Sequence, residues 1–232
     1  MSADVLRVRI DFISDVACPW CAIGLKSLQR ALSRLSGEVE AEWHFQPFEL
    51  NPQLPPEGAD ATQNLMLKYG RGASEIEAMR ATIRQRGAEL GFAYNVGPGS
   101  RIHNTFDAHR LLHWAGLEGR QTALAEALFS AYFTEGRDVS DPAVLQEVAA
   151  GCGLDGARAA QILGSDEYAA EVRTREEFYT TRGIHSVPSI LFDQQKMVPG
   201  AQPPEMFEQF LRGLIAERAQ AAGAVAGAAP PA

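Results

Sequence analysis

Two cysteines separated by two residues are the part of this sequence best equipped for chemistry. Cys18 and Cys21 flank Pro19 and Trp20, directly after an apolar run and at the start of an amphipathic pattern. Pro19 suits the first position of a helix, because its fixed φ fits there and its missing N–H is not needed. Cys18 then caps the helix, where unpaired backbone N–H groups and the positive end of the helix dipole favour its thiolate form. The spacing therefore predicts an activated cysteine at a helix N-terminus.

The helix that follows indicates which sulfur does what. Apolar residues recur every three or four positions on one helical face: Cys21, Leu25, Leu28, Leu32 and Leu35. We therefore expect Cys21 to be buried and Cys18 to be exposed one turn earlier. Asp15 should point away from Cys18, because its charge would oppose a thiolate there. An accessible thiolate with a shielded partner suits disulfide exchange, in which Cys18 attacks and Cys21 resolves the mixed disulfide.

A zinc half-site and two inert core cysteines are the alternative interpretations of the pair Cys18 and Cys21. A structural zinc takes four ligands, commonly including a second CxxC or an HxxxH pair. His109 and His113 are four residues apart, but no acidic or cysteine ligand lies at a matching spacing. Cys152 stands alone between two glycines and is interpreted as a packing thiol. The sequence thus predicts redox chemistry and no metal site.

Composition excludes several classes of protein. The chain has 232 residues, 46% of them hydrophobic, which is enough for a substantial core. Its net charge of −8 and its lack of a basic cluster argue against a nucleic-acid partner. No apolar run is long enough to cross a membrane. The N-terminus lacks the pattern of a secretory signal and three cysteines make no disulfide framework, so we expect a cytoplasmic protein.

The order of the expected elements places the cysteine pair in a strand–helix–strand unit. Alternating residues predict strands at about 5–13 and 39–46, with the cysteine helix between them. Six or so helices without an intervening strand follow. A buried strand at 187–192, a short partner strand at 197–198 and a helix from Pro203-Pro204 close the fold. We therefore divide the chain into one domain made of residues 1–55 and 183–218, a helical insertion at 56–182, and a disordered tail at 219–232, which is dominated by Ala, Gly and Pro.

This organisation resembles the DsbA family, and in particular its cytoplasmic FrnE-like branch, a neighbour of the 2-hydroxychromene-2-carboxylate isomerases and the kappa-class glutathione transferases. Three segments carry the resemblance: Ser14-Asp15-Val16-Ala17-Cys18-Pro19-Trp20-Cys21, Asn104-Thr105-Phe106-Asp107-Ala108-His109-Arg110-Leu111, and Val187-Pro188 through Gly200-Ala201-Gln202-Pro203-Pro204. The resemblance implies an α/β protein with a thioredoxin fold and a large all-helical insertion between its βαβ and ββα halves. It also implies a cis peptide bond at Pro188, facing the cysteines.

The resemblance and the cysteine pair together predict a thiol-disulfide oxidoreductase. Its expected catalytic residues are Cys18, Cys21 and Pro188, and its expected substrate-binding residues are Pro19, Trp20, Val187 and Asn104. Val187 would offer backbone groups to an extended substrate, whereas Trp20 could instead pack against the helices and Asn104 could cap its helix. The substrate is a thiol or a disulfide, of a protein or a small molecule. No cofactor is required, because the cysteine pair is the redox centre; glutathione as a reductant or ligand and a homodimer are both compatible with the sequence.

A glutathione-dependent isomerase or transferase is the alternative function. Those relatives usually carry a serine at the position of Cys18 and use it to hold glutathione. Cys18 therefore favours disulfide exchange, although the other shared segments do not discriminate between the two functions. The direction of electron flow depends on the relative stability of the oxidised and reduced forms, which the sequence does not determine.

Overall fold

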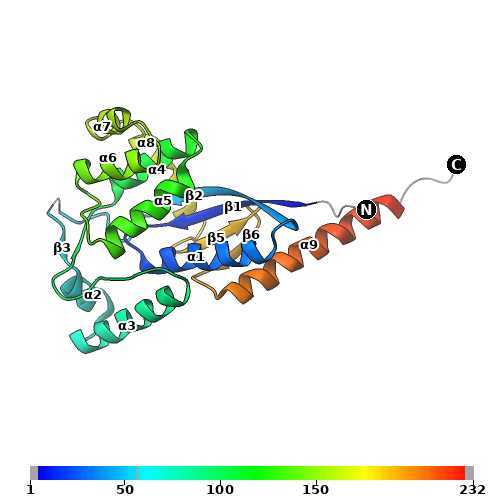
Figure 1. Ribbon diagram of the computed structural model, residues 1–232, viewed down its shortest axis with the longest axis horizontal. Coiled ribbons are helices and arrows are strands. Elements are labelled where there is room, and N and C mark those ends of the chain that lie inside the picture. Colours follow the sequence, from blue (N-terminus) through cyan, green and yellow to red (C-terminus); the bar gives the residue numbers. More distant parts are fainter. Residues whose placement is uncertain (1–4, 56, 228–232) are drawn as a thin grey trace.

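The computed structural model describes residues 5–55 and 57–227, and a mixed four-stranded sheet lies at its centre (Figure 1). The strand β1 (Leu6–Ser14) pairs in parallel with β2 (Val39–Pro47) and antiparallel with β5 (Ser189–Phe192). β5 in turn pairs with β6 (Lys196–Pro199), which gives the order β2-β1-β5-β6. The helix α1 (Pro19–Arg34) connects β1 to β2. The predicted α/β fold, with βαβ and ββα halves, is therefore confirmed.

Helices cover both faces of this sheet. The helix α1 packs beside the C-terminal helix α9 (Pro204–Gly227) on one face, the lower one in Figure 1. Alternate residues of β1, among them Ile10 and Phe12, enter the same core as Leu25 and Leu28 of α1. β1 is buried at every position from residue 10 to residue 14, because its opposite face is covered as well.

The helices of the other layer come from the segment between β2 and β5. This segment contains the helices α2 (Ala61–Tyr69), α3 (Ala73–Glu89), α4 (Phe106–Leu117), α5 (Gln121–Phe129), α6 (Pro142–Gly151), α7 (Gly156–Leu163) and α8 (Ala169–Thr180), and a π-helical turn, η1 (Ser130–Thr134). The helices α4, α5 and α8 contact β2, whereas α3 contacts α1, and both α2 and α3 lie on the side of α1 (Figure 1). None of the helices in the described part of the chain is long and apolar enough to cross a membrane.

The prediction that this insertion contains no strand is wrong at one place. The short strands β3 (Ala59–Asp60) and β4 (Arg101–Ile102) pair antiparallel. Two-residue strands show no alternation along the sequence, so only the approach of two distant segments reveals them.

The helix α9 extends to Gly227, into the segment 219–232 for which disorder is predicted. Alanine has the highest helix propensity of all residues, and this part of the chain is rich in it. The helix can therefore continue beyond the residues that pack against the core. The rest of the predicted tail, 228–232, lies outside the described residues.

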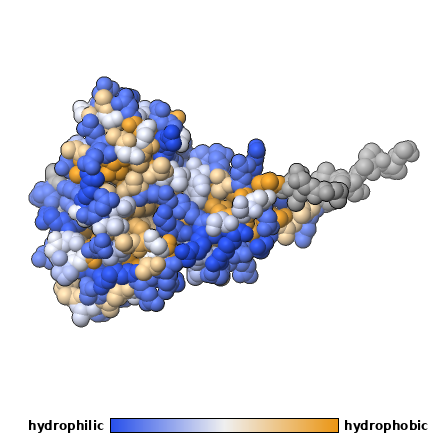
Figure 2. Space-filling model, viewed as in Figure 1, coloured by the Kyte–Doolittle hydropathy of each residue, from blue (hydrophilic) through white to orange (hydrophobic). Residues whose placement is uncertain are grey.

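The surface seen in Figure 2 is mainly hydrophilic, with apolar residues in small groups. This agrees with a net charge of −8, and this face offers no extended apolar patch.

Candidate active site

Cys18 is the N-cap residue of α1, as the sequence predicts. Its backbone is extended, with φ −99° and ψ 109°, and Pro19 follows at the start of the helix. The carbonyl of Cys18 accepts hydrogen bonds from the N–H groups of Cys21 and Ala22, at 3.0 and 3.4 Å. The thiol of Cys18 accepts no capping hydrogen bond from the helix.

The thiol of Cys18 lies against the segment that precedes β5. Its Sγ donates to the carbonyl oxygen of Val187 at 3.7 Å. The peptide bond between Val187 and Pro188 is cis, which confirms the expectation drawn from the resemblance. Pro188 also lies close to α1, because a Cβ on Gly24 would be 3.2 Å from its Cγ. The missing side chain at Gly24 allows this close approach of the proline to the helix.

The predicted exposure of Cys18 is wrong. Cys18 is only 4% exposed and Cys21 is 0% exposed, and both are free thiols. The spacing of apolar residues in α1, taken by itself, leaves Cys18 outside the apolar face of the helix. The segment that carries Val187 then packs against the thiol, and Cys18 becomes part of the main core.

Cys21 has the properties of a resolving cysteine. Burial raises the pKa of its thiol well above the usual value, and the hydrogen bond and charge of the neighbouring Cys18 act in the same direction. Cys21 therefore stays protonated at neutral pH.

Asp15, which was expected to point away from Cys18, is buried, with 1% exposure. Its Oδ1 accepts a hydrogen bond from the N–H of Ala17 at 3.0 Å, and its Oδ2 accepts one from the N–H of Leu50 at 2.6 Å. Both bonds hold the buried carboxylate, and the bond from Leu50 connects the loop before Cys18 to the chain just after β2. The negative charge of Asp15 opposes a thiolate at Cys21, since it is among the causes that raise the pKa of that thiol.

His109 lies next to Asp15 and was missed as a site residue by the sequence analysis, which considered it only for metal binding. Its Nε2 is 3.8 Å from Oδ1 of Asp15 and 3.2 Å from the carbonyl oxygen of Phe48. Burial lowers the pKa of His109, but Asp15 and the charges of Glu176 and Glu49 outweigh it and raise the pKa above its usual value. No local pattern could reveal this pairing, because the partners come from the loop after β1, the loop after β2, α4 and α8.

The remaining predicted residues lie at the edge of this arrangement. Pro19 and Trp20 are half-buried, and Trp20 packs against the main core. The side chain of Asn104 accepts a hydrogen bond from the N–H of Phe106 at 2.8 Å. The N-cap of α4 is Thr105, so Asn104 lies one residue before the capping position that was expected for it. Cys152 is half-buried beside the core after α6, and burial raises the pKa of its thiol.

Comparison with known proteins places this fold and cysteine pair in a family. The chain belongs to the DSBA-like thioredoxin domain family, whose model matches residues 9–212. An uncharacterised protein of Bacillus subtilis strain 168, YwbO, is 27% identical over 205 residues, which are 88% of this chain and 96% of that protein. The predicted family is therefore confirmed.

Solved structures agree with this assignment. The crystal structure of a probable DsbA oxidoreductase from Streptomyces coelicolor is 32% identical, with a TM-score of 0.83 and coverage of 97% of this chain and 92% of that one. Two more distant structures share the fold at 16% identity. They are a 2-hydroxychromene-2-carboxylate isomerase, with a TM-score of 0.66 and coverage of 91% and 98%, and the cytosolic disulfide reductase DsbM of Pseudomonas aeruginosa, with a TM-score of 0.59 and coverage of 89% and 98%.

Proposed function

We propose that this protein is a thiol-disulfide oxidoreductase in which Cys18 attacks and Cys21 resolves. One observation carries the proposal: the thiol at the N-terminus of α1 contacts the carbonyl oxygen of Val187, while a second, protonated thiol lies one helical turn deeper. Membership of the DsbA-like family supports it, as does the description of the similar DsbM as a disulfide reductase.

Written as a reduction, the reaction has two exchanges. The Cys18 thiolate attacks one sulfur of the substrate disulfide, the substrate S–S bond breaks, and the other sulfur leaves as a thiolate that takes up a proton. The Cys21 thiol then loses its proton and attacks the sulfur of Cys18, which forms the Cys18–Cys21 disulfide and releases the second substrate thiol. The substrate gains two electrons and the cysteine pair loses them. A thiol reductant restores the pair, and the reverse sequence would oxidise a dithiol substrate.

Val187 is the proposed contact for the substrate backbone. Its carbonyl oxygen accepts from Cys18, and its N–H has no hydrogen-bond partner among the described residues. An extended segment pairing with Val187 would use both groups, as in strand addition at a sheet edge. Because Cys18 is almost fully buried, the exchange requires the Cys18–Val187 contact to open, and a bound substrate segment would replace it. Pro19 and Trp20 then border the entering substrate.

Glutathione-dependent isomerisation or transfer remains the second candidate, and similarity to the isomerase structure supports it at the level of the fold. The thiol at position 18 argues for disulfide exchange instead, because a serine suffices to hold glutathione. Within the first proposal, glutathione would act as the thiol reductant, and the cytoplasm is the compartment where such a reductant is abundant.

The experiment is a redox titration of the Cys18–Cys21 pair in glutathione buffers, run beside a disulfide-reduction assay and a glutathione-conjugation assay. We expect one two-electron transition, no reductase activity in Cys18→Ala, and a trapped mixed disulfide in Cys21→Ser. Cys152→Ala is the matched control and should retain wild-type activity. Reductase activity that survives in Cys18→Ala would refute the mechanism, and conjugation turnover that persists in Cys21→Ser would establish the second candidate.

A further inference from the structure

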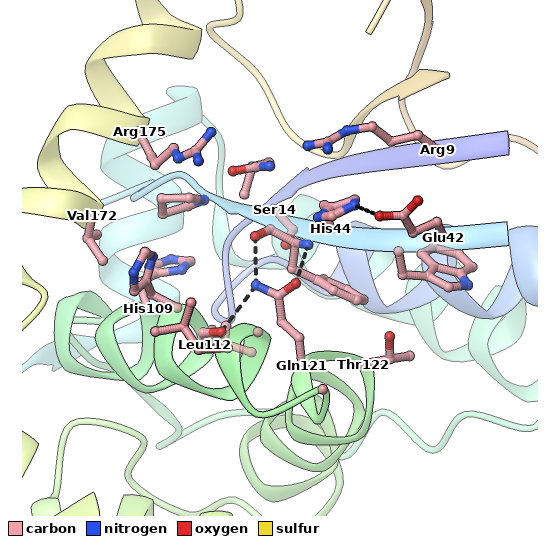
Figure 3. A pocket seen from close by; sticks show the side chains of 18 of the residues that line it. Arg9, Ser14, Glu42, His44, His109, Leu112, Gln121, Thr122, Val172 and Arg175 are labelled. Carbon is pink, nitrogen blue, oxygen red and sulfur yellow. Dashed lines mark hydrogen bonds and ion pairs between the residues drawn. The ribbon is translucent and has the colours of Figure 1, made fainter. Parts of the chain in front are cut away.

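A cavity of about 670 Å³ lies between β2 and the helices α4 and α8, apart from the cysteine pair (Figure 3). Its volume is in the range that holds small-molecule ligands. Neither cysteine lines it, and neither do Val187 and Pro188. The cavity therefore lies apart from the cysteine pair, although His109, the neighbour of Asp15, is among its lining residues.

The side chains around this cavity differ from the rest of the molecule in charge. Three of the chain's five histidines line it, His44, His109 and His113, together with the arginines Arg9 and Arg175. The single acidic residue among the lining residues is Glu42, whose carboxylate is 2.7 Å from the ring of His44. A protein of net charge −8 thus concentrates basic groups at one hollow.

The two arginines reach the cavity from opposite sides. Figure 3 shows the guanidinium group of Arg9, from β1, and that of Arg175, from α8, directed toward one another. Arg9 donates to both carboxylate oxygens of Asp11, at 2.8 and 2.7 Å, so its charge is already offset. Arg173, on the same helix as Arg175, pairs with two carboxylates, whereas Arg175 has none within ion-pair distance among the described residues. Arg175 is therefore the lining arginine whose guanidinium has no carboxylate partner among the described residues.

Most other polar groups of the cavity are engaged within the protein. The amide of Gln121 accepts from the N–H of Phe45 at 2.9 Å and donates to the carbonyl oxygens of Phe45 and Leu112, at 3.0 and 3.1 Å (Figure 3). Burial lowers the pKa of His113, so this ring is neutral at pH 7 and adds no charge. Leu112 and Val172 supply apolar wall.

We propose that this cavity binds a small organic molecule with one carboxylate group and an apolar body. Arg175 and the free edge of Arg9 would hold the carboxylate, since guanidinium groups pair well with planar carboxylates. The apolar body would lie against Leu112 and Val172. One unpaired guanidinium matches one carboxylate, whereas a phosphate dianion would bring a second negative charge close to Glu42. The proposal does not depend on the redox function.

Calorimetric titration with 2-naphthoate tests the site, with its neutral isostere 2-naphthamide and inorganic phosphate as comparison probes. We expect 2-naphthoate to bind saturably, with a dissociation constant of about 1 mM or lower, and 2-naphthamide to bind at least about tenfold more weakly. Arg175→Gln, an exposed position where folding is safe, should weaken 2-naphthoate by about tenfold or more. Arg71→Gln, at an exposed arginine between α2 and α3, is the matched control and should leave the affinity unchanged.

Cys18→Ala separates this cavity from the redox site, and 2-naphthoate should bind it as it binds the wild type. Absence of saturable binding, equal affinity for 2-naphthamide, or tighter binding of phosphate would overturn the proposal. Unchanged affinity in a folded Arg175→Gln protein would do the same, and so would loss of binding in Cys18→Ala.

Discussion

Asp15 is expected to stabilise the loop that presents Cys18, and its replacement by alanine measures how much. The carboxylate accepts hydrogen bonds from the N–H groups of Ala17 and Leu50 and lies 3.8 Å from the ring of His109. Asp15→Ala leaves both donors and the ring without this partner in a buried place. Each of the two donors left unsatisfied costs about 1–3 kcal/mol, so the free energy of unfolding should fall by about 2–6 kcal/mol.

Asp15→Asn separates the hydrogen bonds from the charge. The amide oxygen of asparagine can still accept from one N–H, but its NH₂ group then faces a second donor. We expect a loss between wild type and Asp15→Ala, of about 1–3 kcal/mol. If charge alone mattered, the two variants would lose the same amount.

Urea unfolding followed by far-UV circular dichroism at pH 7 measures both effects. A loss of about 3 kcal/mol moves the midpoint by at least about 1 M when the slope is 1–3 kcal/mol per molar urea. Asp166→Ala is the control, because Asp166 is exposed and its side chain makes no hydrogen bond among the described residues, so its cost should stay within about 0.5 kcal/mol. Equal midpoints for Asp15→Ala and Asp166→Ala would refute this account of the loop.

Three further predictions concern the surroundings of the site. In Cys18→Ala, alkylation of Cys21 by iodoacetamide at pH 7 should be far slower than that of a free cysteine, because burial raises its pKa; a rate equal to that of free cysteine contradicts this. The raised pKa of His109 stabilises the folded protein; this stabilisation is complete below the unfolded pKa of about 6.5 and is lost as pH rises through the folded pKa. The difference in unfolding free energy between wild type and His109→Gln should therefore shrink from pH 6 to 9, and a constant difference contradicts this. Gly24→Val should lower the free energy of unfolding by about 1–3 kcal/mol more than Gly213→Val and should slow disulfide reduction, because a side chain at position 24 meets Pro188 whereas Gly213 faces open space. Equal stability and equal rates for the two variants would contradict this prediction.

The sequence by itself determined the features that depend on neighbours along the chain. Pro19 after Cys18, and apolar residues every three or four positions, were enough to predict a cysteine at the N-cap and Cys21 on the buried face. Alternation predicted β1 and β2, because successive side chains of a strand point to opposite faces. These patterns act within one or two turns, where the geometry of the backbone alone decides which residues share a face.

Only the tertiary structure decided which surfaces those elements would meet. The periodicity of α1 leaves Cys18 outside, and the segment of Val187, 169 residues later in the chain, buries it. Asp15 takes its partners from Leu50 and His109, and the cavity combines groups from β1, β2, α4 and α8. Burial and ion pairing depend on distances between segments that the chain brings together from far apart, and no spacing along the sequence records those distances.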